Sequence, residues 1–356
     1  MNLGLSVQGG LHVFPYQDEG RRSTFALERA RIGLSGHLIS KSFTYRVTGD
    51  GAAGMQSLQP AVPGSETASQ AGAVSVPFLL DAAVRLSVPR IGLAFDFGRF
   101  VPSLGFMMAE RPDRLGTLLY PLYLIGGKNA LGTFRDVGLE MRLALGKAVT
   151  LGGGVFNGGF NNWVDDNDRK DLSAFFIIHP HKAFRLHASA LFKFRNAEGA
   201  KDGMGRSLDN AVETRLTPCF EASYRRFGLT VIGGYAMGLT VRDDRDTRED
   251  DRAQGAFGHV GYRFLGDLLE LSGRFDWWDP SVFQEEDAQY RVTVGPTLHL
   301  ESAHLAVSVN YVQDIYQSEA AACEGMFDDK RCADSDTLRG ISRTPSTILF
   351  QLSLSI

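Results

Sequence analysis

The chain has 356 residues, of which 44% are hydrophobic and 22% are charged, and its formal net charge is −4 at neutral pH. This balance excludes a disordered chain. The small charge and the lack of a basic arm argue against a nucleic-acid partner. No run of about 18 apolar residues predicts a transmembrane helix. A membrane β-strand needs only about 10 residues, every second one apolar, so a membrane β-barrel remains open.

Apolar and polar residues alternate from one end of the chain to the other, which is the pattern of half-buried strands. In segment 183–195, for example, Phe184, Leu186 and Phe192 share one face, and Arg185 and Lys193 lie on the other. The pattern predicts sixteen strands, at about residues 2–14, 24–38, 42–51, 75–88, 91–102, 135–146, 148–159, 171–181, 183–196, 212–226, 229–242, 254–265, 267–279, 288–301, 304–316 and 345–356.

The connections between these strands are alternately short and long. The short ones lie near Ser40, Pro89–Arg90, Gly146–Lys147, His181–Lys182, Phe227–Gly228, Gly266 and Ser302–Ala303. The long ones cover about residues 15–23, 52–74, 103–134, 160–170, 197–211, 243–253, 280–287 and 317–344. Outer-membrane barrels have short periplasmic turns and long extracellular loops in this way.

We therefore predict an all-β fold, a 16-stranded antiparallel transmembrane β-barrel that forms a single domain over residues 1–356 of a bacterial outer-membrane protein. Both chain ends then lie on the side of the short turns. Because a strand-like segment begins at once, we expect a secretory signal peptide to have been removed before Met1. The barrel would contact membrane lipid and lipopolysaccharide.

Strand parity places long charged side chains on one face of the sheet and almost none on the other. The charged face would line the interior, because a charge on the lipid face costs about 2–4 kcal/mol near the midplane. Its cations are Arg29, Arg31, Arg46, Arg85, Arg142, Arg185, Lys193, Arg195, Arg215, Arg225, Arg242, Arg263, Arg274 and Arg291. Its acids are Asp50, Asp81, Asp96, Asp136, Glu140, Glu221, Glu270, Asp276 and Glu301.

Two interpretations of this charged interior remain open. Sixteen strands leave an aqueous channel, and an excess of cations lowers the barrier for small anionic or polar solutes. In that case the cations, chiefly Arg29, Arg31, Arg46, Arg85, Arg142, Arg185, Lys193, Arg195, Arg263 and Arg274, guide anions. Alternatively, the arginines pair with acids on neighbouring strands and only stiffen the wall.

Aromatic residues gather near strand ends on the apolar parity, as in the girdles at membrane interfaces. We assign to such a girdle Tyr45, Phe97, Phe100, Tyr224, Tyr235, Tyr262, Phe275, Trp277, Tyr290 and Tyr311. Ordinary core packing is the alternative.

The longest connection, residues 103–134, has an unusual composition, because it contains an apolar stretch from Leu115 to Ile125. A free extracellular loop would leave this stretch exposed, so we expect the loop to fold into the lumen and narrow it. The charged residues flanking the stretch would line the constriction: Glu110, Arg111, Asp113, Arg114 and Lys128. The alternative is a lid on the rim of the barrel.

The remaining loops predict neither a cofactor nor a metal site. Cys323 and Cys332 lie in one polar loop and are candidates for a disulfide, with two unpaired thiols as the alternative. The acidic run at residues 243–251 lacks the spacing of a calcium loop, so we interpret it as solvated loop charge.

Four short motifs resemble the phosphate-selective porin family of bacterial outer membranes. They are Phe-Ala-Leu-Glu-Arg-Ala-Arg-Ile-Gly-Leu-Ser-Gly at residues 25–36, Phe-Thr-Tyr-Arg at 43–46, Gly-Arg-Phe-Val-Pro at 98–102 and Arg-Asp-Val-Gly-Leu at 135–139. The resemblance covers about residues 24–145. It implies a trimeric sixteen-stranded porin in which Arg29, Arg31 and Arg46 face the channel and guide phosphate-like anions.

We consider three functions. The first is a porin for passive diffusion of small hydrophilic solutes, with a preference for anions. The second is a structural or adhesive barrel plugged by residues 103–134. The third is an enzyme, which we do not expect, because no catalytic motif surrounds the interior histidines His187, His259 and His299.

Overall fold

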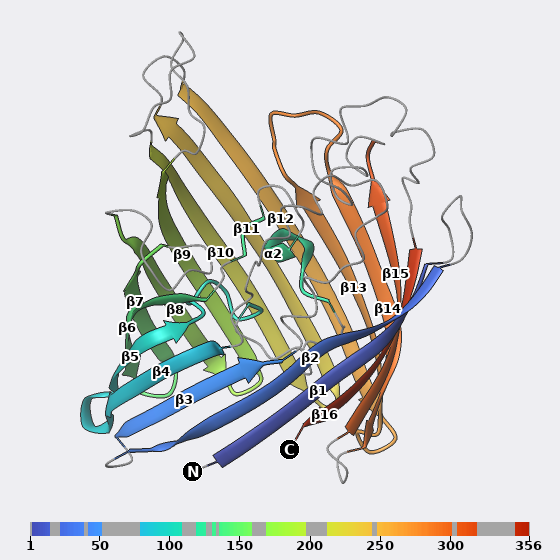
Figure 1. Ribbon diagram of the computed structural model, residues 1–356, viewed down its shortest axis with the longest axis horizontal. Helices are drawn as coiled ribbons and strands as arrows, with labels where there is room; N and C mark the ends of the chain where they lie inside the picture. Colours follow the sequence, from blue (N-terminus) through green and yellow to red (C-terminus); the bar gives the residue numbers. More distant parts are fainter. Residues whose placement is uncertain are drawn as a thin grey trace.

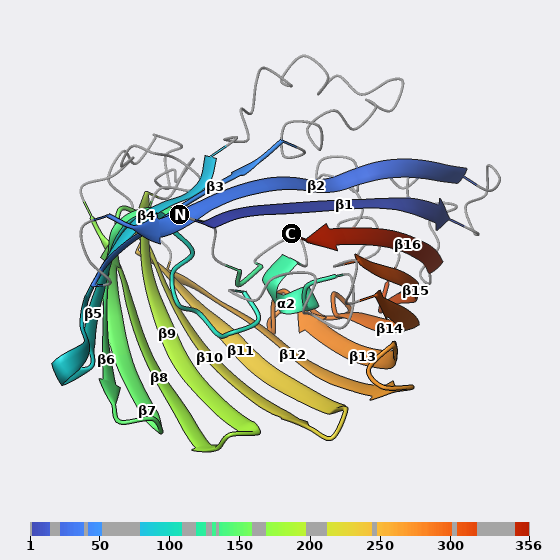
Figure 2. The ribbon, with the colours of Figure 1, turned by 90° about the horizontal axis from the view of Figure 1, so that it is seen from below.

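A computed structural model describes residues 2–14, 22–38, 42–51, 79–108, 119–125, 130–132, 135–158, 169–196, 212–243, 248–300, 305–318 and 346–355. These residues form one closed barrel (Figures 1 and 2). Its strands are β1 (Asn2–Phe14), β2 (Arg22–His37), β3 (Phe43–Asp50), β4 (Leu79–Val88), β5 (Leu93–Phe100), β6 (Asp136–Leu145), β7 (Val149–Phe156), β8 (Asp171–His181), β9 (Phe184–Asn196), β10 (Val212–Arg226), β11 (Leu229–Asp243), β12 (Arg248–Phe264), β13 (Leu269–Asp279), β14 (Gln289–Leu300), β15 (Leu305–Tyr316) and β16 (Ser346–Ser355).

Every strand pairs antiparallel with its neighbours in sequence, and β1 closes the barrel by pairing with β16. The predicted sixteen-stranded antiparallel barrel is therefore confirmed. Among the described residues, the connections contain two short helical elements, η2 (Pro89–Ile91) and α2 (Leu122–Ile125). Among the described residues, no helix is long and apolar enough to cross a membrane.

Most strands begin and end within a few residues of their predicted positions, but β12 does not. It begins at Arg248, six residues before the predicted start at residue 254, and β11 extends to Asp243 to pair with it. The register sets Arg242 opposite Glu249 and Asp243 opposite Arg248. Residues 243 and 248–251 of the acidic run therefore belong to strands, and residues 244–247 lie outside the described residues.

The two faces of the sheet differ as the parity predicted. Large apolar side chains such as Phe97, Leu139 and Val294 are exposed on the outer face, Phe97 to 62%. Polar side chains such as Glu140 and Asn310 are fully buried on the inner face. An outer face of this kind suits hydrocarbon and would be unfavourable in water.

Phe100 is an exception to the predicted girdle. It faces its register partner Asp136, is only 4% exposed, and packs against Phe156 with ring centroids 5.5 Å apart. Cross-strand partners share a face, so Phe100 points inward with Asp96 of the same strand. Its assignment to the outer girdle was wrong, because residues 96 and 100 have the same parity.

Several predicted site residues lie outside the described residues. They are Glu110, Arg111, Asp113, Arg114, Lys128, Cys323 and Cys332. The backbone positions of Arg29 and Arg195 are described, opposite Gln8 and Glu213, but their side chains are not. Among the described cysteines, Cys219 is a buried free thiol.

The outward face of β14 offers a test of the membrane-facing side. We expect Val294→Arg to lower the free energy of unfolding by about 2–4 kcal/mol, because it places a charge in hydrocarbon. The measurement is urea unfolding of the barrel in lipid vesicles. The matched control Val294→Leu should change the value by less than about 1 kcal/mol. An arginine tolerated as well as leucine would contradict a lipid-facing position.

Candidate functional site

The described parts of the connection between β5 and β6 lie inside the barrel. Helix α2 contacts β12 and β13 across the interior (Figure 2). Apolar side chains of this connection form one buried cluster with inward-facing wall residues. The loop contributes Leu104, Phe106, Met107, Leu122, Tyr123, Leu124 and Leu131, and the wall contributes Leu191, Cys219, Ile232, Ala236, Ala253, Phe257 and Trp278. The described parts of the loop therefore cover the wall from β9 to β13.

The carboxylate of Glu221 on β10 accepts three hydrogen bonds from the described part of the loop. It accepts hydrogen bonds from the backbone N–H groups of Phe106 and Met107 and, at 2.6 Å, from the hydroxyl of Tyr123. Burial and the nearby charge of Glu221 raise the pKa of Tyr123 well above its ordinary value, so its hydroxyl remains a donor.

Gly105 is required at this contact for two reasons. Its φ of +65° is a left-handed conformation, and a Cβ there would lie 2.6 Å from Oε1 of Glu221. Its own N–H donates to the hydroxyl of Ser189 at 2.9 Å. The loop backbone therefore turns against two polar side chains of the wall.

A buried ion pair holds the second part of the loop. Nε of Arg274 lies 2.8 Å from Asp276, and both side chains are fully buried. Asp276 accepts the N–H of Leu122, while the guanidinium donates to the carbonyls of Leu119 and Tyr120. The pair thus satisfies backbone groups at the entry to α2 that would otherwise lack partners.

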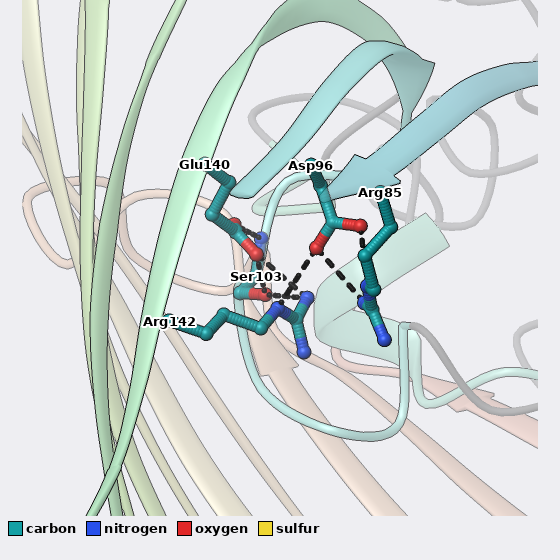
Figure 3. Close-up of polar contacts among 5 residues, drawn as sticks. All are labelled: Arg85, Asp96, Ser103, Glu140 and Arg142. Carbon is teal, nitrogen blue, oxygen red and sulfur yellow. Dashed lines mark hydrogen bonds and ion pairs between the residues drawn. The ribbon is translucent and has the colours of Figure 1, made fainter. Parts of the chain in front are cut away.

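The start of the loop joins the opposite part of the wall through a four-charge cluster (Figure 3). Arg85 binds Asp96 through two hydrogen bonds of 2.7 and 2.8 Å, and Arg142 lies 3.3 Å from the same carboxylate. Arg142 also donates to Glu140 at 2.6 Å and to the hydroxyl of Ser103 at 3.2 Å. Glu140 in turn accepts the N–H and hydroxyl of Ser103.

Within this cluster the side chains of the cations are more exposed than those of the acids. The side chains of Arg85 and Arg142 are 45% and 33% exposed, whereas those of Asp96 and Glu140 are 11% and 0% exposed. The cluster has two positive and two negative charges, and its positive ends face the lumen. The guanidinium groups are therefore the more accessible part of the cluster.

Acids on neighbouring strands also bind other predicted channel-lining arginines. Arg31 pairs with Asp50 at 2.9 Å, and Arg263 pairs with Glu270 at 2.8 Å. Glu270 also lies 3.0 Å from Nε2 of His299. The cross-strand pairing that the sequence left as an alternative is therefore present in the wall.

Three more of the predicted cations differ from one another in their neighbours. Arg46 shares a face with Arg85 and is exposed, and no acid pairs with it among the described residues. Arg185 lies over the ring of Phe106, 4.9 Å from its centroid. Lys193 lies opposite Arg215 on β10 and is half-buried. The predicted cations thus lie on several strands, from β2 to β13, and are not gathered at one point.

Sequence reasoning placed Glu221 and Asp276 on the inner face but did not identify them as contacts for the loop. Ser103 and Tyr123 were missed as polar partners, because no local pattern distinguishes them. The interior histidines His187 and His259 are buried in the wall. In the part of the chain that the structure describes, no group of three potential metal ligands occurs.

No protein-family model matches the chain, and no curated protein sequence matches it significantly. Solved outer-membrane structures match its fold. Salmonella typhi OmpF in complex with daunomycin is 14% identical, with a TM-score of 0.63 over 100% of this chain and 97% of that chain. The DcaP channel of Acinetobacter baumannii is 12% identical, with a TM-score of 0.64 over 100% and 96% of the two chains. Vibrio cholerae OmpT in a trimer form is 10% identical, with a TM-score of 0.58 over 100% and 98%.

The chain therefore has the fold of bacterial outer-membrane porins and channels. These matches share the general porin fold and do not single out the phosphate-selective family that the short motifs resemble.

The Glu221 contact makes a prediction about the loop. Glu221→Ala removes the acceptor shared by three buried donors, at a cost of about 1–3 kcal/mol for each donor left unpaired, so we expect the loop to leave its position while the barrel stays folded. Planar-bilayer recordings should show greater current noise, and vesicle-swelling assays should show entry of larger sugars. Ser223→Ala, on the same strand and face, is the control. If both variants behave like the unaltered protein, Glu221 does not hold the loop.

Proposed function

We propose that the protein is a water-filled pore of the bacterial outer membrane for passive diffusion of small hydrophilic solutes, with a preference for anions. The observation that carries this proposal is the one-sided position of the loop. Its apolar residues cover the wall from β9 to β13, while exposed arginines such as Arg46 and Arg85 lie on β3 and β4. A constricted passage between an apolar loop and a basic wall is consistent with this arrangement.

The anion preference rests on the orientation of the ion pairs. Each carboxylate of the four-charge cluster is more deeply buried than its arginine. A dipole with its positive end toward the lumen attracts anions although the pair is neutral. Because the guanidinium groups already donate to acids, we propose a mild preference for small anions in general and no dedicated phosphate site.

A plugged structural barrel is the second candidate. It is favoured by the buried apolar cluster, which joins loop residues such as Leu104 and Tyr123 to the wall. Single-channel recordings separate the two candidates. Conductance steps after reconstitution support the pore, and their absence at high protein concentration supports the plugged barrel.

We also propose a homotrimer surrounded by membrane lipid and lipopolysaccharide. Vibrio cholerae OmpT, one of the structures that share this fold, forms a trimer. Strands β3, β5 and β7 have only 8 residues each, fewer than the 9–11 that usually span the hydrocarbon. A neighbouring protomer that covers these short strands would shield them from the hydrocarbon that they are too short to span.

Arg46 provides a direct test of anion preference. We expect Arg46→Ala to lower the chloride-to-potassium permeability ratio roughly two- to fivefold, because a unit charge at about 4 Å in water contributes about 1 kcal/mol. Reversal potentials in a potassium chloride gradient measure the ratio. Arg169→Ala, which removes an exposed cation before β8, should leave the ratio nearly unchanged. Equal ratios for Arg46→Ala and the unaltered protein would refute a role for this cation.

Replacing Asp96 should change the chloride-to-potassium permeability ratio in the opposite direction. Asp96→Asn removes the negative charge behind Arg85 and Arg142, so the permeability ratio should rise in favour of chloride. Reversal potentials measured in the same gradient test this expectation. A fall in the ratio would mean that loss of the acid displaces the arginines. The explanation that exposed arginines in front of buried acids attract anions would then be wrong.

A further inference from the structure

Four of the short turns share a chemical pattern unrelated to the lumen. They join β4 to β5, β6 to β7, β8 to β9 and β10 to β11, and all lie at the end of the barrel where both termini lie (Figure 1). Each turn or its edge carries an exposed cation, in order Arg90, Lys147, Lys182 and Arg226. None of these turns contains an acid, and none of the four cations pairs with a carboxylate among the described residues. We call this set the basic rim.

Exposed apolar side chains accompany the cations of the basic rim. Ile91 follows Arg90 and is 59% exposed, Leu145 precedes Lys147, and Phe227 follows Arg226 and is 77% exposed. The guanidinium of Arg226 lies 4.3 Å from the centroid of the Phe227 ring. Such side chains are unfavourable in water but suit the border between hydrocarbon and headgroups, where aromatic rings and long cations gather.

The register places the end of β10 on the outer surface. Arg226 faces Leu229, which in turn faces Tyr262, and cross-strand partners share a face. Tyr262 is an exposed residue of the outer face and stacks on Phe264 with centroids 6.0 Å apart. Arg226 therefore lies on the same outer face of the barrel as this aromatic pair, with β11 between them, and not in the lumen.

We infer that the basic rim binds the headgroups of anionic phospholipids in the leaflet on the side of the short turns. The apolar residues Ile91 and Phe227 insert among the upper acyl chains, and the neighbouring cations reach the phosphates. The charge arrangement favours this partner because a cation near an anionic leaflet contributes about 1 kcal/mol, which corresponds to roughly a fivefold preference per residue. The inference rests on the membrane-spanning fold and is independent of the proposed transport.

The test compares lipid binding by three forms of the full chain in neutral detergent. The rim variant is Arg90→Gln/Lys147→Gln/Lys182→Gln/Arg226→Gln, and the control is Arg169→Gln/Lys170→Gln, which removes two exposed cations preceding β8 at the other end of the barrel. Native mass spectrometry counts bound phosphatidylglycerol against phosphatidylcholine with the same acyl chains. Heat-dependent migration on gels checks that each form is folded.

We expect the unaltered protein and the control to prefer phosphatidylglycerol roughly tenfold or more, and the rim variant to lose most of this preference. The preference should weaken in high salt. Equal binding of both lipids by the unaltered protein would overturn the inference, and so would a rim variant that keeps the preference.

A separate variant tests the apolar residues of the basic rim. Ile91→Ser/Phe227→Ser should weaken binding of both lipids alike and keep their ratio, because the phosphates are held by the cations. If the rim instead serves a soluble polyanion, the unaltered protein will sediment with isolated cell-wall sacculi, the rim variant will not, and neither form will distinguish the two lipids. That outcome would refute lipid binding even if the pore conducts normally.

Discussion

Hydrocarbon offers no hydrogen-bond partner to a peptide group, so each unpaired N–H or C=O in a bilayer costs several kcal/mol. The barrel meets this constraint by pairing every strand with two neighbours and closing β1 on β16. Closure also fixes the direction of each side chain, because successive residues of a strand point to opposite faces. The apolar outer surface, the polar interior and the positions of the arginines all follow from it.

The interior then needs acceptors for the loop that enters it. A buried backbone N–H requires a partner, and the inward-facing acids supply one. Glu221 receives the donors of Phe106, Met107 and Tyr123, whereas Asp276 receives that of Leu122. The buried acids of the wall therefore position the described parts of the loop together with the apolar cluster.

The strands could be predicted from the sequence, but the contacts of the loop between β5 and β6 could not. Alternation is a local pattern, so segment 183–195 predicted β9 almost to the residue. The start of β12 was missed because charged residues hide the alternation before position 254. The contact between Glu221 and Phe106 joins residues 115 positions apart, and no local pattern encodes it. Which arginine binds which acid likewise depends on strand register.

Net charge does not explain an anion preference, since the chain has a formal charge of −4. The proposed preference would have to be local and arise from neutral pairs in which the cation is the more exposed partner, as in Arg85 with Asp96. Such a field fades within a Debye length of about 8 Å at physiological salt. In a wide barrel most ions would pass beyond that distance. In the proposed pore, the loop bound to Glu221 leaves less space on the far side, so ions would pass closer to the arginines of β3 and β4. Under that proposal, pore width and ion preference depend on the same buried carboxylate.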